Sequence, residues 1–187
     1  MSELWEAYED WLIRLAMQPL PGGVTVAALS AAMGAALVTK VLRITVASQS
    51  LSSSEQEMLE GILILADDKR AELLQLARAD EGAYRTVLNT QGLPASDPAR
   101  YRAWKRATEV PIQLAETCGA LLDRLPVVLD LCRPSVLVDI QVGSWLLDAG
   151  KRAGVRAAEA NLQAWGEQAQ GETFRSRLDA LLEGELD

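Results

Sequence analysis

The chain has 187 residues, a length typical of one domain, and 49% of them are hydrophobic while 24% are charged. This balance excludes an intrinsically disordered chain and a membrane bundle. The formal net charge is −8, and such a surface repels phosphate backbones, so we expect no nucleic-acid partner. The chain has no histidine, which excludes Ser–His and Cys–His catalytic pairs and leaves Asp, Glu, Lys, Tyr or Cys as acid–base groups.

The two cysteines, Cys118 and Cys132, cannot fill a tetrahedral zinc site without histidine, so we expect no metal. Two thiols and no signal peptide fit the reducing cytosol, so the expected location is cytoplasmic. The stretch between Arg14 and Lys40 carries no charge. Prolines and glycines interrupt it and its helical part is rich in alanine, so we expect a buried helix and no membrane span.

Apolar residues recur at helical spacing along most of the chain, and strand signals are nearly absent. A first helix is expected from Ser2 to the turn at 19–23. A second should cover about 24–46, with alanines along its inner face that allow a neighbouring helix to come close. The third is expected over 55–90, with Ser54 and Glu57 forming a capping box at its start.

The second half of the chain predicts three more helices. Asp97–Pro98 provides a favoured start for the fourth, and Pro111 is expected to kink or break it. Asp139 is expected to cap a helix over 139–165, and a short last helix should cover 173–183. The sequence therefore predicts one all-α domain over residues 1–187, an elongated antiparallel bundle of about six helices.

The first segment that suggests chemistry is the turn before the second helix. Gly22 and Gly23 are adjacent there, and paired glycines allow backbone N–H groups to approach a ligand closely. The positive end of the helix dipole adds attraction for a carboxylate, a phosphate or a developing oxyanion. The alternative interpretation is a tight turn between two helices, and the glycines alone do not decide between them.

Asp80 lies on the apolar face of the third helix, in register with Leu73, Leu76, Tyr84 and Val87. Burying an unpaired carboxylate is costly, and partial burial would raise its pKa and make it a proton acceptor near neutral pH. The alternatives are an ion pair with a neighbouring Lys or Arg, or solvent at that turn. Both interpretations stay open at this point.

A groove of small residues leads to Asn161 in the helix expected over 139–165. Gly150, Gly154 and Ala157 share one face of that helix with Asn161. Small residues on one face indicate either very close helix packing or room for a flat ligand. The spacing does not separate these two explanations.

Taken in order, several segments resemble the cyclodeaminase/cyclohydrolase family, which includes the C-terminal domain of formiminotransferase-cyclodeaminase and bacterial methenyltetrahydrofolate cyclohydrolases. The motifs that carry the resemblance are Pro19-Leu-Pro-Gly-Gly23, Thr25-Val-Ala-Ala28, Met33-Gly-Ala-Ala-Leu37, Asp80-x-x-Ala-Tyr84 with Leu93-Pro94, Ala107-Thr-x-Val-Pro111, and Asp139 opening a helix that ends near Asn161. The resemblance covers most of the chain.

The resemblance implies a homodimeric helical bundle that acts on a folate-type small molecule, without a metal or other cofactor. The reaction would be hydrolysis of 5,10-methenyltetrahydrofolate, or cyclisation of 5-formiminotetrahydrofolate with release of ammonia. Asp80 would be the base, while Asp139 would contact the pterin or be the base instead. The residues implied in substrate binding are Pro21, Gly22, Gly23, Thr25, Lys40, Arg43, Tyr84 and Asn161.

The chain also departs from the family pattern. Val24 and Thr25 stand where the family usually has a third glycine and a serine, and Arg43 stands where it has asparagine. Residues 47–51 lack the usual lysines, and Ala157 replaces the first asparagine of a pair. These differences motivate an alternative prediction, a non-catalytic dimeric scaffold or a ligand-binding relative that has lost turnover.

Overall fold

The computed structural model describes residues 2–48, 51–166 and 171–183, and within these ranges the regular structure is helical, with no strand. The predicted all-α bundle is therefore confirmed. In chain order the elements are α1 (Ser2–Met17), α2 (Gly23–Ser48), α3 (Ser53–Thr90), α4 (Pro98–Leu122), α5 (Leu125–Leu131), the 3₁₀ helix η1 (Pro134–Val136), α6 (Leu137–Trp165) and α7 (Gly171–Glu183).

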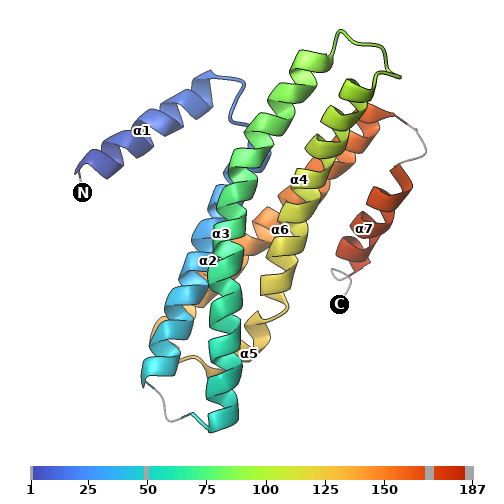
Figure 1. Ribbon diagram of the computed structural model, residues 1–187. Helices are drawn as coiled ribbons and strands as arrows, with labels where there is room; N and C mark the ends of the chain where they lie inside the picture. The colour runs from blue at the N-terminus through green and yellow to red at the C-terminus, as the bar shows by residue number, and fades with distance from the viewer. Residues whose placement is uncertain (1, 49–50, 167–170, 184–187) are drawn as a thin grey trace.

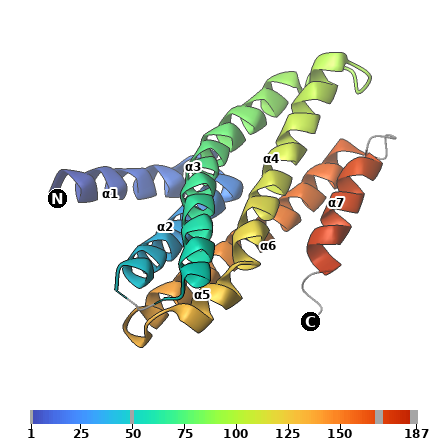
Figure 2. The same ribbon diagram turned by 60° about the horizontal axis from the view of Figure 1, so that its bottom comes forward.

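The four long helices form the bundle, in which α2 and α4 each pack against both α3 and α6 (Figure 1). One face of α2 lies in its centre, because Ala28, Ala31, Ala35 and Val38 are fully buried. By length and composition the segment Gly23–Ala47 is apolar enough to cross a membrane, but half of its most apolar window is buried within the bundle. Two helices flank the bundle: α1 projects from one side, and α7 lies along the other (Figures 1 and 2).

The small residues of α6 bring its axis very close to α2 and α4. A Cβ atom placed on Gly154 would lie 2.5 Å from the Pro111 carbonyl oxygen, and one on Gly34 would lie 2.7 Å from the Gly143 carbonyl oxygen. Carbon atoms do not approach oxygen that closely, so only hydrogen fits at these points. Close packing therefore accounts for the glycines in the middle of α6.

The start of α3 differs from the prediction. The capping box is formed by Ser52 and Glu55, because the Ser52 hydroxyl accepts from the Glu55 N–H at 3.3 Å and the Glu55 carboxylate accepts from the Ser52 N–H at 2.7 Å. These bonds from Ser52 lower the pKa of Glu55. The prediction of Ser54 and Glu57 was wrong because three consecutive serines offer three starting points, and the helix begins at the first of them.

Two predictions about prolines and caps were also tested. Asp97 caps α4 as expected, accepting from the Ala99 N–H at 2.7 Å. Pro111 lies inside an uninterrupted α4, so the predicted break is wrong. Asp139 is not the cap of α6, because the preceding 3₁₀ turn leads directly into a helix that begins at Leu137 and leaves Asp139 in its first turn.

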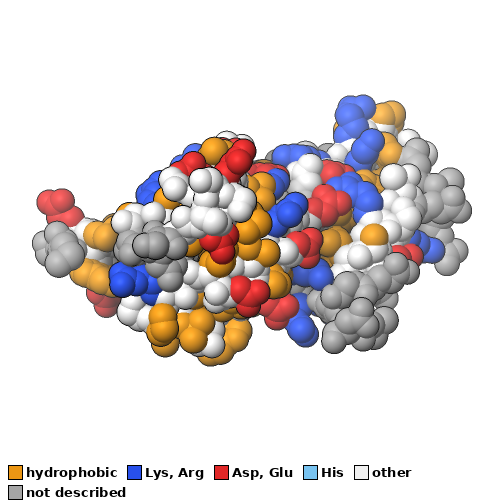
Figure 3. Space-filling model, turned by 90° about the horizontal axis from the view of Figure 1, so that it is seen from below, with side chains coloured by type: hydrophobic (Ala, Val, Ile, Leu, Met, Phe, Trp, Pro, Cys, Tyr) orange, Lys and Arg blue, Asp and Glu red, His pale blue; other side chains and the backbone are white. Residues whose placement is uncertain are grey.

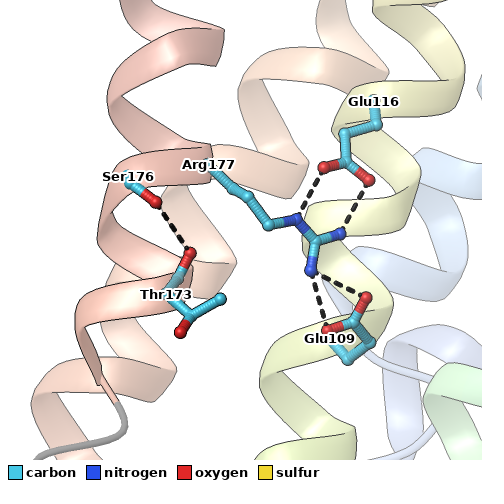
Figure 4. A network of polar contacts seen from close by, with 5 residues as sticks. All are labelled: Glu109, Glu116, Thr173, Ser176 and Arg177. Carbon is cyan, nitrogen blue, oxygen red and sulfur yellow. Dashed lines mark hydrogen bonds and ion pairs between the residues drawn. The ribbon is translucent and has the colours of Figure 1, made fainter.

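A pair of acidic side chains on α4 holds α7 against the bundle (Figure 4). The Arg177 guanidinium donates two bonds of 2.7 Å to the Glu116 carboxylate and bonds of 2.9 Å to Glu109. The bonds to Glu116 are the main reason that the pKa of Arg177 lies above its ordinary value. Beside this network, Phe174 and Leu178 are buried against α4 and α6.

Candidate active site

A cavity of about 320 Å³ opens where α2 begins and α6 ends, beside the C-terminal half of α3. Five of the predicted site residues, Gly22, Gly23, Asp80, Tyr84 and Asn161, lie in its wall. They come from three helices and the turn before α2, and only the fold brings them together. The remaining wall is formed by Pro19, Leu20, Val24, Ala157 and Ala160.

Asp80 is half-buried and is held by Thr25, which lies in the first turn of α2. Its Oδ2 accepts from the Thr25 backbone N–H at 3.0 Å and from the Thr25 hydroxyl at 2.8 Å. Burial raises the pKa of Asp80, and the two bonds from Thr25 lower it by a smaller amount. Among the described residues no cation pairs with Asp80, so the ion-pair interpretation is wrong and the carboxylate is suited to accept a proton.

The glycine turn presents its backbone to the same cavity. Because Asp80 already occupies the Thr25 N–H, it acts as the cap of α2, and the N–H groups of Gly23 and Val24 have no acceptor within the described ranges. A Cβ atom on Gly22 or Gly23 would meet nothing within 4 Å. Packing within the chain therefore does not require these glycines, and the open space beside them is available to a ligand.

Asn161 has a role in the fold as well as a place in the cavity. Its Nδ2 donates to the Ala107 carbonyl at 2.7 Å. In a regular helix the N–H four residues later would bond this carbonyl, but that residue is Pro111, which has no N–H. The carbonyl can only accept, so the amide nitrogen must face it. The Asn161 Oδ1 is left as the atom that can accept from a ligand.

The other predicted binding residues near the turn occupy the edge of the site. Tyr84 lines the cavity one helical turn after Asp80 and is 41% exposed. Pro21 and Thr25 line a second cavity of about 160 Å³, which shares Leu20 with the first. Arg14 of α1 also lines this second cavity, and sequence reasoning missed it, although its position one turn before Pro19 was a signal.

Lys40, Arg43 and Asp139 lie outside both cavities. The Lys40 ammonium pairs with Asp139 at 2.8 Å, and the Arg43 guanidinium pairs with Asp67 at 2.7 Å. Asp139 is in the first turn of α6, whereas Asn161 is near its last, so the two lie toward opposite ends of the bundle. Within one chain, the fold does not bring these three residues to Asp80, and their predicted roles stay predictions.

The thiols contribute no acid–base group to this cavity. Cys118 is fully buried, and burial raises its pKa to about 12. Cys132 is half-buried on the segment after α5, and burial raises its pKa as well. Across the described ranges no group of three or more His, Cys, Asp or Glu side chains could hold a metal ion. The chemistry of the cavity therefore depends on Asp80, Tyr84, Asn161 and the backbone of the glycine turn.

Comparison with known proteins gives consistent matches. The family model described as formiminotransferase-cyclodeaminase matches residues 9–180. A methenyltetrahydrofolate cyclohydrolase of Methylorubrum extorquens is 30% identical over 189 aligned residues, which cover 97% of this chain and 89% of that protein. A formimidoyltransferase-cyclodeaminase of Rattus norvegicus is 29% identical over 171 residues, which cover 87% of this chain but 31% of the longer rat protein.

A solved structure shares the fold. The crystal structure of formiminotetrahydrofolate cyclodeaminase from Thermotoga maritima superposes with a TM-score of 0.77 at 23% sequence identity. The match covers 89% of this chain and 81% of that one. The helical arrangement described above is therefore also the arrangement of that protein.

Proposed function

Since the chain belongs to the formiminotransferase-cyclodeaminase family, we propose that it is a one-carbon folate enzyme that hydrolyses 5,10-methenyltetrahydrofolate. The observation that carries this proposal is the half-buried, cation-free carboxylate of Asp80 in an open cavity. The alignment with a methenyltetrahydrofolate cyclohydrolase over 97% of the chain supports the choice of reaction. The substrate would be the tetrahydrofolate derivative itself, without a metal.

The methenyl carbon is an electrophilic, amidinium-like centre. Asp80 would take a proton from the attacking water while a new carbon–oxygen bond forms. The free N–H groups of Gly23 and Val24 would stabilise the developing negative charge on that oxygen. The hydroxyl of this adduct then gives its remaining proton to solvent, one carbon–nitrogen bond breaks with its electron pair staying on nitrogen, that nitrogen takes the proton held by Asp80, and a formyl group remains. Asn161 and Tyr84 would orient the ring system.

A second candidate reaction is cyclisation of 5-formiminotetrahydrofolate with release of ammonia. Formimidoyltransferase-cyclodeaminases that align with 87% of the chain support it. The attacking nitrogen would lose its proton to Asp80, so the same cavity could serve both reactions. Against the non-catalytic alternative, the cavity beside the glycine turn is open although Val24 and Ala157 depart from the family pattern.

We also propose that the protein is a cytoplasmic homodimer. The location is proposed because the relatives are named as folate enzymes, and the dimer because the motifs resemble a family of dimeric helical bundles. Lys40, Arg43 and Asp139 keep their proposed roles toward the substrate, although within one chain they lie away from the cavity.

The test is the loss of methenyltetrahydrofolate absorbance on addition of purified protein, with ammonia release from 5-formiminotetrahydrofolate as a parallel assay. Asp80→Asn should reduce turnover by on the order of a hundredfold or more, because the amide cannot accept the proton. Asp130→Asn is the matched control, since Asp130 is exposed on α5, away from the cavity residues. If the wild-type protein turned over neither substrate but still bound one, the non-catalytic alternative would replace this proposal.

A further inference from the structure

Helix α1 stands off from the bundle and exposes an unusual number of large apolar side chains. It projects to one side in both ribbon views (Figures 1 and 2). Leu4, Trp5, Ile13 and Met17 are between 55% and 80% exposed. Trp5 meets Tyr8 edge to face with ring centroids 6.5 Å apart, and Tyr8 stacks on Trp11 with centroids 6.0 Å apart. A helix with apolar groups on several sides usually has a packing partner on more than one side.

Between α1 and the bundle lies an apolar groove of about 520 Å³. Trp11 and Leu12 form one wall, Leu29 and Met33 of α2 form the floor, and Leu74 of α3 closes it, with Arg70 as the charged residue of the lining. Met33 is 52% exposed. The outward stripe of α2 from Val26 to Leu37 contains no charge. Hydrophobic side chains also gather along one edge of the molecule in the view from below (Figure 3).

The total exposed area of the chain is larger than that expected of a compact monomer, which indicates a surface that a partner could cover. The chain exposes 10953 Å², whereas a compact monomer of its 20.3 kDa exposes about 8,800 Å². The difference, roughly 2,000 Å², exceeds the roughly 800 Å² that each partner buries in a standard interface. The projecting α1 and the groove beside it contribute exposed apolar side chains to this surface.

We propose that this face, the groove-lining side of α1 with the outward stripe of α2, docks the same face of a second copy of the chain. The face carries both a projecting apolar helix and an apolar groove, and a two-fold axis places each of these against the other. This proposal rests on the homodimer proposed above and identifies its interface. It predicts that Met33 and Trp11 become buried on association.

A lipid surface is the other occupant that an apolar face suggests, and the charges argue against it. The first ten residues of the chain contain Glu3, Glu6, Glu9 and Asp10, and α1 has Arg14 as its single cation. Peripheral membrane helices instead carry Lys and Arg on their polar face, because the lipid surface is anionic. A second protein copy does not impose that requirement.

The test is the molar mass of the purified full chain by light scattering after size exclusion, without substrate. We expect wild type at twice 20.3 kDa and Met33→Arg at 20.3 kDa with an unchanged helical circular dichroism spectrum. Met33 is exposed in the single chain, so arginine there should not disturb the monomer. Leu182→Arg is the matched control, because Leu182 is also partly exposed but lies on α7, on the other side of the bundle, and its dimer should persist.

Each other outcome overturns the proposal. A wild-type monomer at millimolar concentration would remove the dimer, and sedimentation of that monomer with phosphatidylcholine–phosphatidylglycerol vesicles would assign the face to lipid. A Met33→Arg dimer would place the interface elsewhere. Asp80→Asn should keep the dimer mass while losing turnover, so failure of the interface and failure of the proposed reaction are measured separately.

Discussion

The side chain of Asn161 takes the place of a backbone N–H that Pro111 lacks, by donating to the Ala107 carbonyl at 2.7 Å. We therefore expect Asn161→Leu to lower the free energy of unfolding by about 1–3 kcal/mol, because it leaves a partly buried carbonyl without a donor. Urea denaturation measures this. Asn161→Gln keeps the amide group but lengthens the side chain, so it tests whether the bond to the Ala107 carbonyl depends on the position of that amide. Unchanged stability in Asn161→Leu would show that Asn161 serves the ligand alone.

Thr25 tunes the acidity of the candidate base. Its hydroxyl bond lowers the pKa of Asp80 and partly offsets the effect of burial. Thr25→Val removes the hydroxyl at similar volume, so the pKa of Asp80 should rise and the acidic limb of the pH–rate profile should move to higher pH. Thr25→Ser keeps the donor and should keep the wild-type profile. An identical profile for all three proteins would remove Asp80 as the group that controls that limb.

Asp80→Asn should also change how stability depends on pH. The pKa of Asp80 is raised in the folded state, so its contribution to stability is present below the ordinary pKa of about 3.9 and is lost as the pH rises through the folded value. The amide does not titrate, so the stability of the variant relative to wild type should increase from pH 3 to pH 7. Thermal melting at both values measures this. A variant that is less stable relative to wild type at pH 7 than at pH 3 would contradict the raised pKa of Asp80.

Two glycine substitutions separate ligand approach from helix packing. Gly23→Ala places its Cβ in open space, so stability should stay unchanged while turnover or ligand affinity falls. Gly154→Ala forces a Cβ within 2.5 Å of the Pro111 carbonyl and should lower stability by about 1–3 kcal/mol. The two melting temperatures and the two activities give the comparison. If Gly23→Ala kept full activity, the turn would have only a connecting role.

The sequence predicted the helices well because their apolar periodicity is long and uninterrupted. It predicted the burial of Asp80 for the same reason, since the spacing from Leu73 and Leu76 places it on the buried face of α3. The errors concern places where neighbouring residues offer alternative helix starts, or where a residue distant in sequence changes the outcome. Pro111 was expected to kink or break α4, and the helix runs through it without a break. Neither the local sequence nor helix propensities show that Asn161, fifty residues later, supplies the missing donor.

The composition of the candidate site was harder to predict, because it depends on distances between helices. Lys40 and Asp139 were assigned to the cavity that contains Asp80, yet in the fold they pair with each other at 2.8 Å outside it. Their position along α2 and α6 follows from the sequence, but the alignment of each helix along its neighbours, which separates them from Asp80, does not. The Thr25–Asp80 contact joins residues 55 positions apart and likewise required the structure.

The close helix contacts at Gly34 and Gly154 also limit how the helices can move relative to one another. Sliding α6 by one residue, about 1.5 Å, would carry larger side chains into spaces that accept only hydrogen. The bundle therefore resists the helix shear by which many helical proteins close on a ligand. The turn at 18–22 is not locked in this way, since a Cβ on Gly22 meets nothing. Closure over a bound molecule should come from that turn, with the four-helix frame remaining fixed.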